Sequence, residues 1–552
     1  MATAETRVRA LDGALAATSG LVAGELVAGA LPMARSPLTG TGKLMIDLTS
    51  PLAVDMTVAT AEHLDKPILR GALVAQLIGL GAAAGARLSP RPVGAVVAGA
   101  GIATGIAAAT RSESSTLPSL MAGAAAAAGG AGAHALVGRG AGRRARIVLG
   151  AATAAGALAA LALASRKRRV LTGKRDLVDL GDRPFPRDSI PADASFEIPG
   201  LSPLFTPPGD FYTTDTQLPA PAIDPDEWRL RVTGMVEEPL ELSFDDLLAL
   251  DPVELDATLV CVHNPVGGPR IDSARWLGVP IARLLEESKP LPGASQLLAR
   301  SVDGYTSGVP LPWIEAGSTA ILAIGMAGEP LPTVNGFPAR LLIPGLWGAD
   351  ANTKWVTELE LTTWEAIRDY WDRRGWPRTP TSVRPGSRID VPANRALVVG
   401  EPVRAAGVAW APPSGVEGVE VSIDGGEWQA AELSRELAPT MWRQWRLELV
   451  PEPGEHRMRV RAIGRARPQS GEWEPPYPTG SSGFHEVHFE VLDSEPSLLR
   501  RVHALAGAAG DDLGRRMRLA RAAVGAWRER GYPPSPRFPP PQSHGYLRKG
   551  VE

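Results

Sequence analysis

The single cysteine of the 552-residue chain, Cys261, lies in the stretch Thr258–Gly268 (TLVCVHNPVGG), between an apolar run and a pair of glycines. Such a cysteine has three uses: an inert core residue, a nucleophile with a positioned base, or a thiolate ligand of a metal. His263 is two residues away from this cysteine. One thiolate is too few for a zinc site or an iron–sulfur cluster. It suffices for a metal that is held mainly by an organic cofactor.

The totals exclude several classes of protein. One cysteine rules out an intramolecular disulfide, a Cys-x-x-Cys metal site and a Cys-x-x-Cys-His haem attachment. The formal net charge of -3 argues against a general nucleic-acid binder, because no basic field dominates. The apolar stretches of the first third contain a single histidine, His134, so they cannot supply two histidine ligands to a haem. The sequence therefore predicts no haem or iron–sulfur cluster in this chain and no nucleic-acid partner.

Several blocks around Cys261 resemble the sulfite oxidase superfamily of molybdopterin-dependent oxidoreductases, and they occur in the family's order over about residues 205–378. The blocks are FYTTDTQLPAPAIDPDEWRLRVTG, ATLVCVHN, SARWLGVPIARLL, MAGEPLPTVNGFPARLLIPGLWGADANTKWVTELEL and YWDRRGW. The resemblance implies a molybdenum–molybdopterin cofactor whose metal is bound by the thiolate of Cys261. It also implies two-electron oxygen-atom transfer on a small substrate.

The resemblance also places cofactor contacts on numbered positions of this chain. A guanidinium can bind a phosphate with two parallel hydrogen bonds and an ammonium adds a point charge, so Arg340 and Lys354 suit the phosphate. The residues that the resemblance assigns to the pterin and its phosphate are Tyr212, Thr213, Ser301, Asn335, Arg340, Thr353 and Lys354. The same pattern places His263, Asp303 and Tyr305 in the substrate pocket, as catalytic candidates beside Cys261.

The chain departs from animal and plant sulfite oxidases where those enzymes bind their anion. TTDTQLPAP has Asp215 near the position of an arginine, HNPVGG replaces Asn-Arg-Arg after the cysteine, and Trp376 stands where a pocket tyrosine is expected. Each change removes a donor or a cation, which argues against sulfite itself. The sequence around Asn335 and the pair Phe211–Tyr212 also resemble the bacterial branch that reduces sulfoxides. A sulfite-like and a sulfoxide-like substrate, and both directions of transfer, stay open.

Short strands and helices must position these residues. Alternating apolar residues predict strands in WRLRVTG, ELDATLVCV, RLLIPG and KWVTELELTT. The second of these delivers Cys261 to a strand end. LELSFDDLLAL predicts a strand end followed by a helix with Ser243 as N-cap, and Ala274–Ser288 is expected to turn into a helix. The pattern predicts an α+β domain over residues 205–380, preceded by a linker over residues 171–204 with proline and glycine punctuation.

The first third of the chain has the composition of membrane helices. Five apolar stretches are each about 19 to 22 residues long, and one helical span needs about 20. They cover residues 13–33, 68–86, 92–110, 117–138 and 147–165. Their many alanines and glycines allow helices to pack closely. Residues 1–170 are therefore predicted to form an all-α transmembrane bundle of about five helices, with Glu25 facing the bundle, protonated or paired.

Basic residues suggest how the bundle is oriented. With the N-terminus inside, the inner loops carry more arginine than the outer ones, as the positive-inside rule requires, and only Arg166–Arg169 (RKRR) violates the rule. Arg143–Arg144 precede a weakly apolar stretch and resemble a twin-arginine signal, which exports a folded domain. The sequence thus favours a multi-pass protein of the cell membrane with its catalytic domain on the extracytoplasmic face. The alternative is that Arg166–Arg169 keep this domain in the cytoplasm.

Residues 385–492 are predicted to form an all-β domain. VEVSIDGGEWQAAEL is a strand–turn–strand pattern, and WRQWRLELV and HRMRVRAIG alternate well. The domain resembles the immunoglobulin-like β-sandwich that follows the molybdenum domain in sulfite oxidases, and this resemblance implies a homodimer. Two alternatives stay open for the basic tail, residues 493–552: an amphipathic helix on a membrane or partner, or a solvated, partly disordered segment.

The sequence therefore predicts a membrane-anchored molybdenum enzyme that acts on a small molecule. With no second redox group predicted, it also needs a separate electron carrier, either a cytochrome or a quinone-linked partner. The alternative is a non-catalytic membrane scaffold or binding protein built on a degenerate molybdopterin fold. Retention of Cys261 together with Arg340 and Lys354 argues against that alternative, because an empty fold has no evident use for them.

Overall fold

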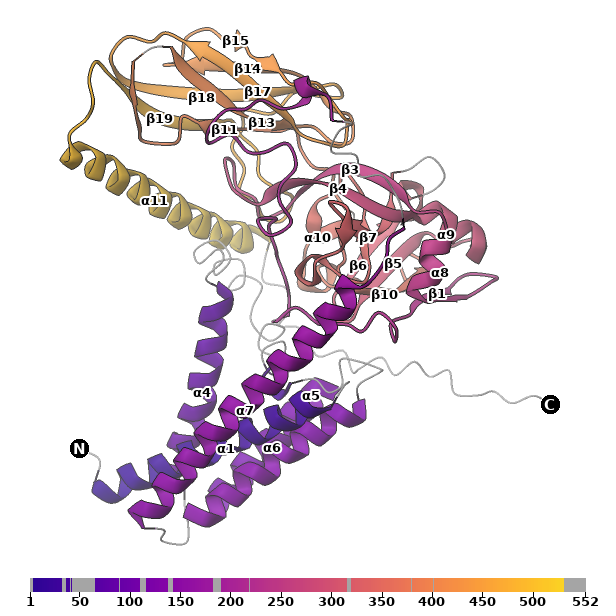
Figure 1. Ribbon diagram of the computed structural model, residues 1–552, viewed down its shortest axis with the longest axis vertical. Coiled ribbons are helices and arrows are strands. Elements are labelled where there is room, and N and C mark those ends of the chain that lie inside the picture. The colour runs from indigo at the N-terminus through magenta and orange to yellow at the C-terminus, as the bar shows by residue number, and fades with distance from the viewer. Residues whose placement is uncertain are drawn as a thin grey trace.

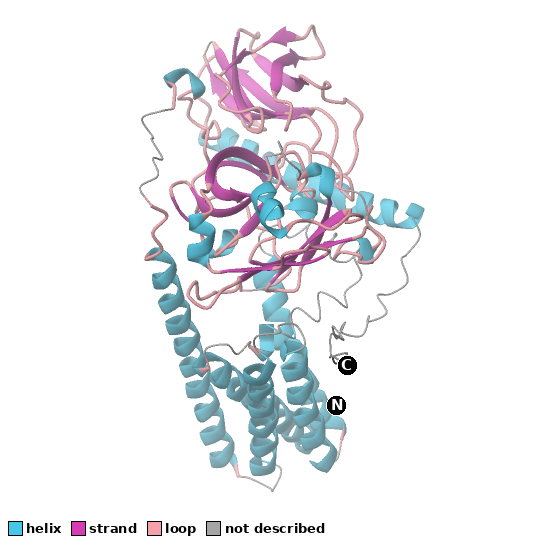
Figure 2. Ribbon diagram, turned by 90° about the vertical axis from the view of Figure 1, so that its right-hand side faces the viewer, coloured by secondary structure: helices cyan, strands magenta, loops and turns pink. Residues whose placement is uncertain are grey.

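Three parts follow one another along the long axis of the molecule: a helical bundle, a central α+β domain and a β domain (Figures 1 and 2). The computed structural model describes residues 3–31, 36–39, 41, 65–88, 90–109, 116–137, 142–181, 190–217, 219–314, 319–378, 380–400 and 402–530. The central domain lies between the other two parts in both views.

The bundle contains five long helices among the described residues, in agreement with the five predicted stretches. They are α1 (Ala4–Ala30), α4 (Asp65–Arg87), α5 (Pro90–Ala109), α6 (Thr116–Val137) and α7 (Arg143–Asp176). Glycines permit close contact, since a Cβ at Gly13 would lie 2.0 Å from the carbonyl oxygen of Gly81. By length and composition, three described segments could cross a membrane: Ala4–Ala30, Leu117–Val137 and Arg143–Asp176.

Polar contacts join α1 to α7 along the bundle. Asp12 is buried and accepts hydrogen bonds from Nε and Nη2 of Arg146 at 2.6 and 3.0 Å. One heptad further along both helices, the hydroxyls of Ser19 and Thr153 lie 2.8 Å apart. Equal steps along both chains mean that α1 and α7 run parallel. The pairing satisfies polar groups that would otherwise be costly in an apolar bundle.

The carboxyl group of Glu25 has hydrogen-bond partners, and whether it is protonated or paired with a charge stays a prediction. It accepts hydrogen bonds from the hydroxyl of Ser36 at 2.7 Å and from the backbone N–H of Leu38 at 3.0 Å. Both donors belong to the short segment that follows α1. Glu25 therefore holds this segment against the helix.

Helix α7 continues past residue 170, the predicted end of the bundle, to Asp176. Arg166–Arg169 lie within this one helix, and Lys167 donates to the carbonyl of Leu31 at 2.9 Å. The chain then enters the central domain, where Leu180 is buried in the core. The predicted linker thus begins as helix. A single continuous element joins the bundle to the central domain (Figure 1).

The central domain contains two five-stranded sheets. The first has the order β2 (Leu240–Leu242), β1 (Leu230–Gly234), β10 (Val356–Thr362), β5 (Gln296–Ser301) and β6 (Thr306–Pro310). The second contains β3 (Val253–Val260), β4 (Ile271–Pro280), β7 (Ile321–Met326), β8 (Glu329–Pro330) and β9 (Arg340–Leu342), which pairs with β7. Three helices accompany them: α8 (Phe244–Ala249), α9 (Ile281–Ser288) and α10 (Gly348–Ala351).

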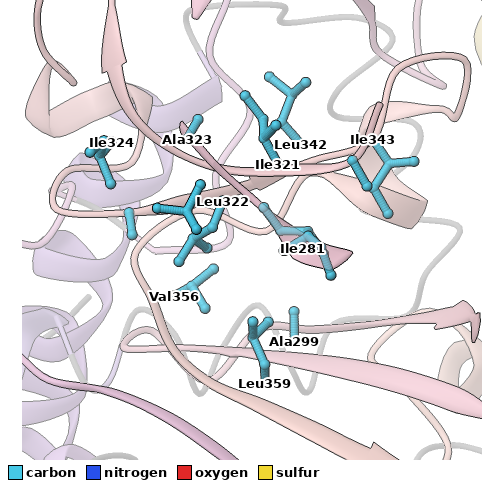
Figure 3. Packing of buried hydrophobic residues seen from close by; sticks show 14 of the residues in the cluster. Ile281, Ala299, Ile321, Leu322, Ala323, Ile324, Leu342, Ile343, Val356 and Leu359 are labelled. Atoms are coloured by element: carbon cyan, nitrogen blue, oxygen red, sulfur yellow. The ribbon is translucent and has the colours of Figure 1, made fainter. Parts of the chain in front are cut away.

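The core of this domain is built around β7, all of whose residues are buried. A continuous apolar strand is expected where both faces of a sheet are covered. Figure 3 shows Leu322 of β7 near Ile281 of α9 and Val356 of β10, with Leu359 beyond them. The core thus joins the two sheets and fixes the strands that carry the site.

Most of the predicted elements of this domain are confirmed. Ser243 caps α8, and Asp246 completes a capping box with it. The prediction for Ala274–Ser288 was wrong in its first half, because β4 occupies Ile271–Pro280 and only Ile281–Ser288 is helical. Strand β4 pairs with β3 on one edge and β7 on the other, and this tertiary pairing decides its conformation.

The C-terminal part contains two sheets that share one core. One has the order β11 (Gly386–Val391), β13 (Val403–Trp410), β17 (Arg443–Leu449) and β16 (Glu432–Leu433). The other has the order β12 (Ala396–Val399), β19 (His485–Leu492), β18 (Gly454–Gly464), β14 (Val416–Ile423) and β15 (Gln429–Ala430). The hairpin β14–β15 and the all-β character are confirmed; the immunoglobulin-like fold stays a prediction.

Helix α11 (Leu498–Arg530) follows the β domain. The tail is helical over these residues, whereas contact of this helix with a membrane or partner stays a prediction. Leu519 and Ala523 are buried against the domain, and Arg395 forms an ion pair with Asp511 at 2.7 Å. Residues 531–552 lie outside the described residues.

Candidate active site

Cys261 lies immediately after β3 and is 4% exposed. Its Sγ is 3.7 Å from the hydroxyl of Thr214 and 3.8 Å from Nδ1 of His263. His263 therefore contacts the thiol, as expected for side chains two residues apart, which lie on the same side of an extended segment. The strand itself ends at Val260, before both residues.

The surroundings of Cys261 favour the thiolate. Burial raises the pKa of the thiol, but the hydrogen bond and charge of His263, with the charge of Arg270, outweigh burial and lower the pKa from 9.0 to about 7. A thiolate is the form that binds a soft metal ion. The site therefore presents a ligand that is already partly ionised at neutral pH.

Strand β3 is held on both edges. It pairs with β4 along one edge. On the other edge, Thr258 donates its N–H to the carbonyl of Thr440 at 3.0 Å, and the N–H of Trp442 donates to the Thr258 hydroxyl at 2.7 Å. Residues 440–442 belong to the C-terminal part. The strand that delivers the cysteine is thus clamped between two domains.

The β domain also holds the segment after the cysteine, residues 262–268, which we name the cysteine loop. Ser481 donates to the carbonyl of Asn264 at 2.7 Å, and Arg388 donates to the carbonyl of Gly268 at 3.0 Å. A Cβ at Gly267, whose φ is +72°, would lie 2.2 Å from the ring of His485. The loop is therefore packed against the β domain without spare room.

Aromatic rings enclose His263. The ring centroids of Tyr477, Trp376 and Trp371 lie 4.9, 5.6 and 6.2 Å from the imidazole centroid. Trp371 and Trp376 stack on each other at 4.1 Å. Trp376, noted from the sequence as a departure from the family pattern, lies in this group. Tyr477 comes from the C-terminal part, so both domains build the site.

Near Cys261, several buried polar atoms have no hydrogen-bond partner. They are the hydroxyl of Tyr212, both amide atoms of Asn335 and of Asn352, and Nε of Arg340. Three of these residues are neighbours: Arg340 donates to the Asn335 carbonyl at 3.3 Å, and the charges of Cys261 and Arg340 both act on Tyr212. A buried polar group without a partner costs about 1–3 kcal/mol. The set therefore fits a polar ligand that supplies the missing partners.

The two predicted phosphate-binding cations differ in their surroundings. Arg340 is 6% exposed, burial lowers the pKa of its guanidinium, and it lies 5.4 Å from the ring of Trp276. Lys354 forms an ion pair with Asp215 and donates to the carbonyl of Val334 at 2.9 Å. The departure at Asp215 thus has a structural role, since this carboxylate neutralises a nearly buried ammonium.

The other predicted site residues lie around this centre. Thr353 is buried and shares a 2.7 Å hydrogen bond with Ser307, whereas Thr213 is exposed. Ser301 ends β5 and Asp303 lies in the turn that follows, where the Asp303 N–H donates to the Ser301 hydroxyl at 3.3 Å.

The side chains of Asp303 and Tyr305 are engaged in fixed contacts. Asp303 accepts from Thr216 at 2.9 Å and from the Tyr305 N–H at 3.0 Å. The Tyr305 hydroxyl donates to the carbonyl of Ala349 at 2.5 Å. Burial and nearby carboxylates raise the pKa of this phenol well above 10.0, so it stays a donor. The hydroxyl of Tyr305 thus contacts α10. A catalytic role for Asp303 and Tyr305 stays a prediction.

A metal at Cys261 would need ligands from outside the protein. Within the described ranges, no group of three or more His, Cys, Asp or Glu side chains could hold a metal ion. The donor set fits a metal whose other ligands belong to an organic cofactor. The residues present therefore agree with the cofactor that the resemblance implies.

Sequence reasoning missed five residues of the site. Thr214, Asn352 and Trp371 lie in blocks that carry the resemblance, so those blocks carried a signal. Arg270 is nine residues after Cys261, and its backbone carbonyl accepts from the Cys261 N–H at 3.0 Å. Tyr477 is far along the chain in another domain, and no local pattern identifies it.

Comparisons with known proteins agree with this site. A family described as "Oxidoreductase molybdopterin binding domain" matches residues 217–371. Mitochondrial sulfite oxidase of Mus musculus is 28% identical over 53% of this chain and 63% of its own length. The uncharacterized oxidoreductase YuiH of Bacillus subtilis is 31% identical over 28% of this chain and 74% of its own length. The chain covers less than two thirds of each vertebrate sulfite oxidase that it matches.

Two further matches extend the comparison. The NADPH nitrate reductase of Emericella nidulans is 30% identical over 31% of this chain and 23% of its own length. Among solved structures, the sulfane dehydrogenase SoxCD from Paracoccus pantotrophus matches with a TM-score of 0.46 and 21% identity, over 52% of this chain and 84% of that one.

Proposed function

Because this chain belongs to the sulfite oxidase superfamily of molybdopterin-dependent oxidoreductases, we propose that it is a membrane-anchored enzyme for two-electron oxygen-atom transfer. The observation that carries the proposal is a buried thiol with a lowered pKa beside buried polar groups that lack partners. No other described part of the chain combines a soft ligand with such a set. The substrate is a small molecule.

The residues divide the work of holding the cofactor. Cys261 is the single protein ligand of the metal, and His263 orients the thiolate and favours its charge. The amide of Asn335 and the hydroxyl of Tyr212 bind the polar pterin, while Arg340 binds the phosphate as a fixed cation. When bound, the cofactor supplies the two-electron chemistry; the protein supplies binding, orientation and charge.

The substrate-side residues support a neutral molecule, such as a sulfoxide-like compound, over a sulfite-like anion. Aromatic rings of Trp371, Trp376 and Tyr477 surround His263, which lies against the thiol. Asp215, near the expected position of an arginine, adds a carboxylate in place of a cation. Apolar walls and a lost cation penalise a desolvated anion. The direction of transfer depends on the substrate.

The first 176 residues support membrane anchoring, since three helical segments are long and apolar enough to cross a bilayer. The parallel course of α1 and α7 supports an odd number of spans, with the N-terminus and the central domain on opposite sides of the membrane. We place the catalytic domain on the extracytoplasmic face. The enzyme exchanges electrons with a separate carrier, a cytochrome or a quinone-linked protein, and the β domain is a candidate homodimer surface.

Molybdenum and pterin analysis of the purified full-length protein tests the proposal. We expect about one molybdenum per chain in the wild type, and Cys261→Ser should lose the metal or alter its spectrum because an alkoxide is a poor substitute for a soft thiolate. Wild-type protein from a host unable to make the cofactor is the control. If the wild-type protein contains no molybdenum in cells that load another molybdopterin enzyme, the proposal is wrong and the non-catalytic scaffold is supported instead.

A further inference from the structure

Residues 330–337 carry Asn335 and lead into Arg340; we name them the cofactor loop. Part of the loop forms a short 3-10 helix, Thr333–Asn335. A buried backbone carbonyl needs a hydrogen-bond donor, so the source of each donor shows what holds the loop. Donors from the loop itself bind two carbonyls, since the N–H of Asn335 donates to Pro332 at 2.8 Å and the N–H of Gly336 donates to Thr333 at 3.4 Å.

Side chains of the central domain bind three carbonyls, of which that of Thr333 also accepts from the loop itself. Nε1 of Trp355 donates to Thr333 at 2.7 Å, and Nζ of Lys354 donates to Val334 at 2.9 Å. The guanidinium of Arg340 donates to Asn335 at 3.3 Å. These contacts fix the backbone of Asn335 while its amide atoms keep no partner, so they leave the amide available to a ligand.

The first two carbonyls of the loop are bound from the end of α7. Nη2 of Arg175 donates to Pro330 at 2.6 Å, and Nε donates to Leu331 at 2.8 Å. The Arg175 side chain is only 14% exposed, and its Nη1 pairs with Asp176 at 2.6 Å. A planar guanidinium that binds two successive carbonyls fixes both position and direction, which a single flexible donor cannot do.

The end of α7 is itself seated firmly in the central domain. Leu180 is buried, and a Cβ at Gly325 in β7 would lie 2.9 Å from its Cδ1. Gly325 pairs with Pro330, the first residue of the cofactor loop. The helix end, the hairpin β7–β8 and the loop therefore form one packed unit.

We infer that Arg175 is a positioning residue for the cofactor loop, through which the helix that leaves the bundle holds the pterin-binding residues in place. The inference rests on the proposed function for the identity of the ligand. The end of α7 then contributes to cofactor binding through Arg175. A site held rigidly before binding loses less conformational entropy when it takes its ligand.

Arg175→Ala, Arg175→Lys and, as a matched control, Lys174→Ala test the inference in the full-length protein. Lys174 is one residue away on the same helix end and pairs with Asp224 and Asp226, not with the loop. Two readouts apply: hydrogen exchange of the Asn335–Phe337 amides, and the rate of molybdopterin loss after dilution.

We expect Arg175→Ala to speed both amide exchange and cofactor loss roughly tenfold, since it removes two charge-assisted hydrogen bonds. Arg175→Lys can make one of the two contacts and should give intermediate values. Lys174→Ala should match wild type. If Arg175→Ala fails to fold, Arg175→Lys decides, because wild-type exchange in that variant would overturn the inference.

Wild-type exchange and cofactor retention in Arg175→Ala would overturn the inference while leaving the proposed function intact. Wild-type protein without molybdopterin would instead contradict the proposed function. Amide exchange is measured on the chain itself, so it reports on the loop in either case.

Discussion

The chemistry of the candidate site depends on one residue, Cys261, and on the groups that set its charge. His263 and Arg270 lower the pKa of its thiol to about 7 against the effect of burial. The side-chain polar atoms of Tyr212 and Asn335 are buried and have no hydrogen-bond partner. Each feature is local, yet each requires that several chain segments meet around the sulfur. A second residue, His485, makes the stability of the protein around this site depend on pH.

His485 packs against the cysteine loop and accepts a hydrogen bond from the N–H of Ile389 at 2.9 Å. Burial, then the charge of Arg388, lowers the pKa of its imidazole from 6.5 to about 4, while Asp390 opposes this shift and Arg515 adds to it. The unfolded chain binds the proton at a higher pH than the folded chain. The neutral imidazole of His485 therefore stabilises the folded state fully above about pH 6.5, and this stabilisation is lost as the pH falls towards 4.

We expect the apparent melting temperature of the purified protein to fall between pH 7 and pH 4, as measured by differential scanning calorimetry. His485→Asn keeps an acceptor for the Ile389 N–H but does not titrate in this range, so its melting temperature should fall less. Equal slopes for the two proteins would show that other groups govern the acid sensitivity.

At the scale of the elements, the arrangement of β3 and the cysteine loop decides the geometry. Strand β3 is bound by β4 on one edge and by residues 440–442 on the other. The cysteine loop then turns against the β domain, where Arg388 and Ser481 bind its carbonyls. The cysteine is thus presented from a backbone that two domains hold in place. Close packing of this kind makes the loop intolerant of added atoms.

Gly267 and Gly304 offer a matched test of this packing. Both have positive φ, +72° and +81°, but a Cβ at Gly267 would lie 2.2 Å from the His485 ring while nothing lies within 4 Å at Gly304. Gly304→Ala should cost only backbone strain, about 1–2 kcal/mol. Gly267→Ala adds overpacking of about 1–3 kcal/mol.

We therefore expect Gly267→Ala to lower the melting temperature and the molybdenum content more than Gly304→Ala does. Parallel measurements on the two variants separate the steric clash from the strain. If both variants behave alike, the contact between the cysteine loop and the β domain does not constrain the site.

At the scale of the whole molecule, the bundle, the central domain and the β domain follow one another, and α7 links the first two without interruption (Figure 1). Arg166–Arg169 lie on α7 where the helix leaves the bundle for the central domain. Parallel α1 and α7 are consistent with the N-terminus and the C-terminal domains on opposite sides of a membrane.

Labelling with a membrane-impermeant maleimide tests the proposed orientation. Thr3 and Ser497 are both exposed, and Cys261, the only native cysteine, is buried. With the periplasmic or outer surface accessible, we expect Ser497→Cys to be labelled in intact cells and Thr3→Cys only after lysis. The unsubstituted protein measures background labelling of Cys261. The reverse pattern would place the catalytic domain in the cytoplasm.

The sequence by itself determined most of the elements and the candidate site residues. Five apolar stretches, the Ser243 cap and most strands follow from local composition and periodicity, which need only neighbouring residues. The blocks around Cys261, Asn335 and Arg340 are contiguous, so a resemblance can identify them. Such signals locate residues along the chain and name the chemistry that they could perform.

Only the tertiary structure decided how these residues meet. The first half of Ala274–Ser288 is a strand because β3 and β7 pair with it. Tyr477 and Arg175 act on the site from another domain and from the bundle helix. Contacts between residues so far apart in sequence depend on packing of whole elements, and no local pattern encodes that packing.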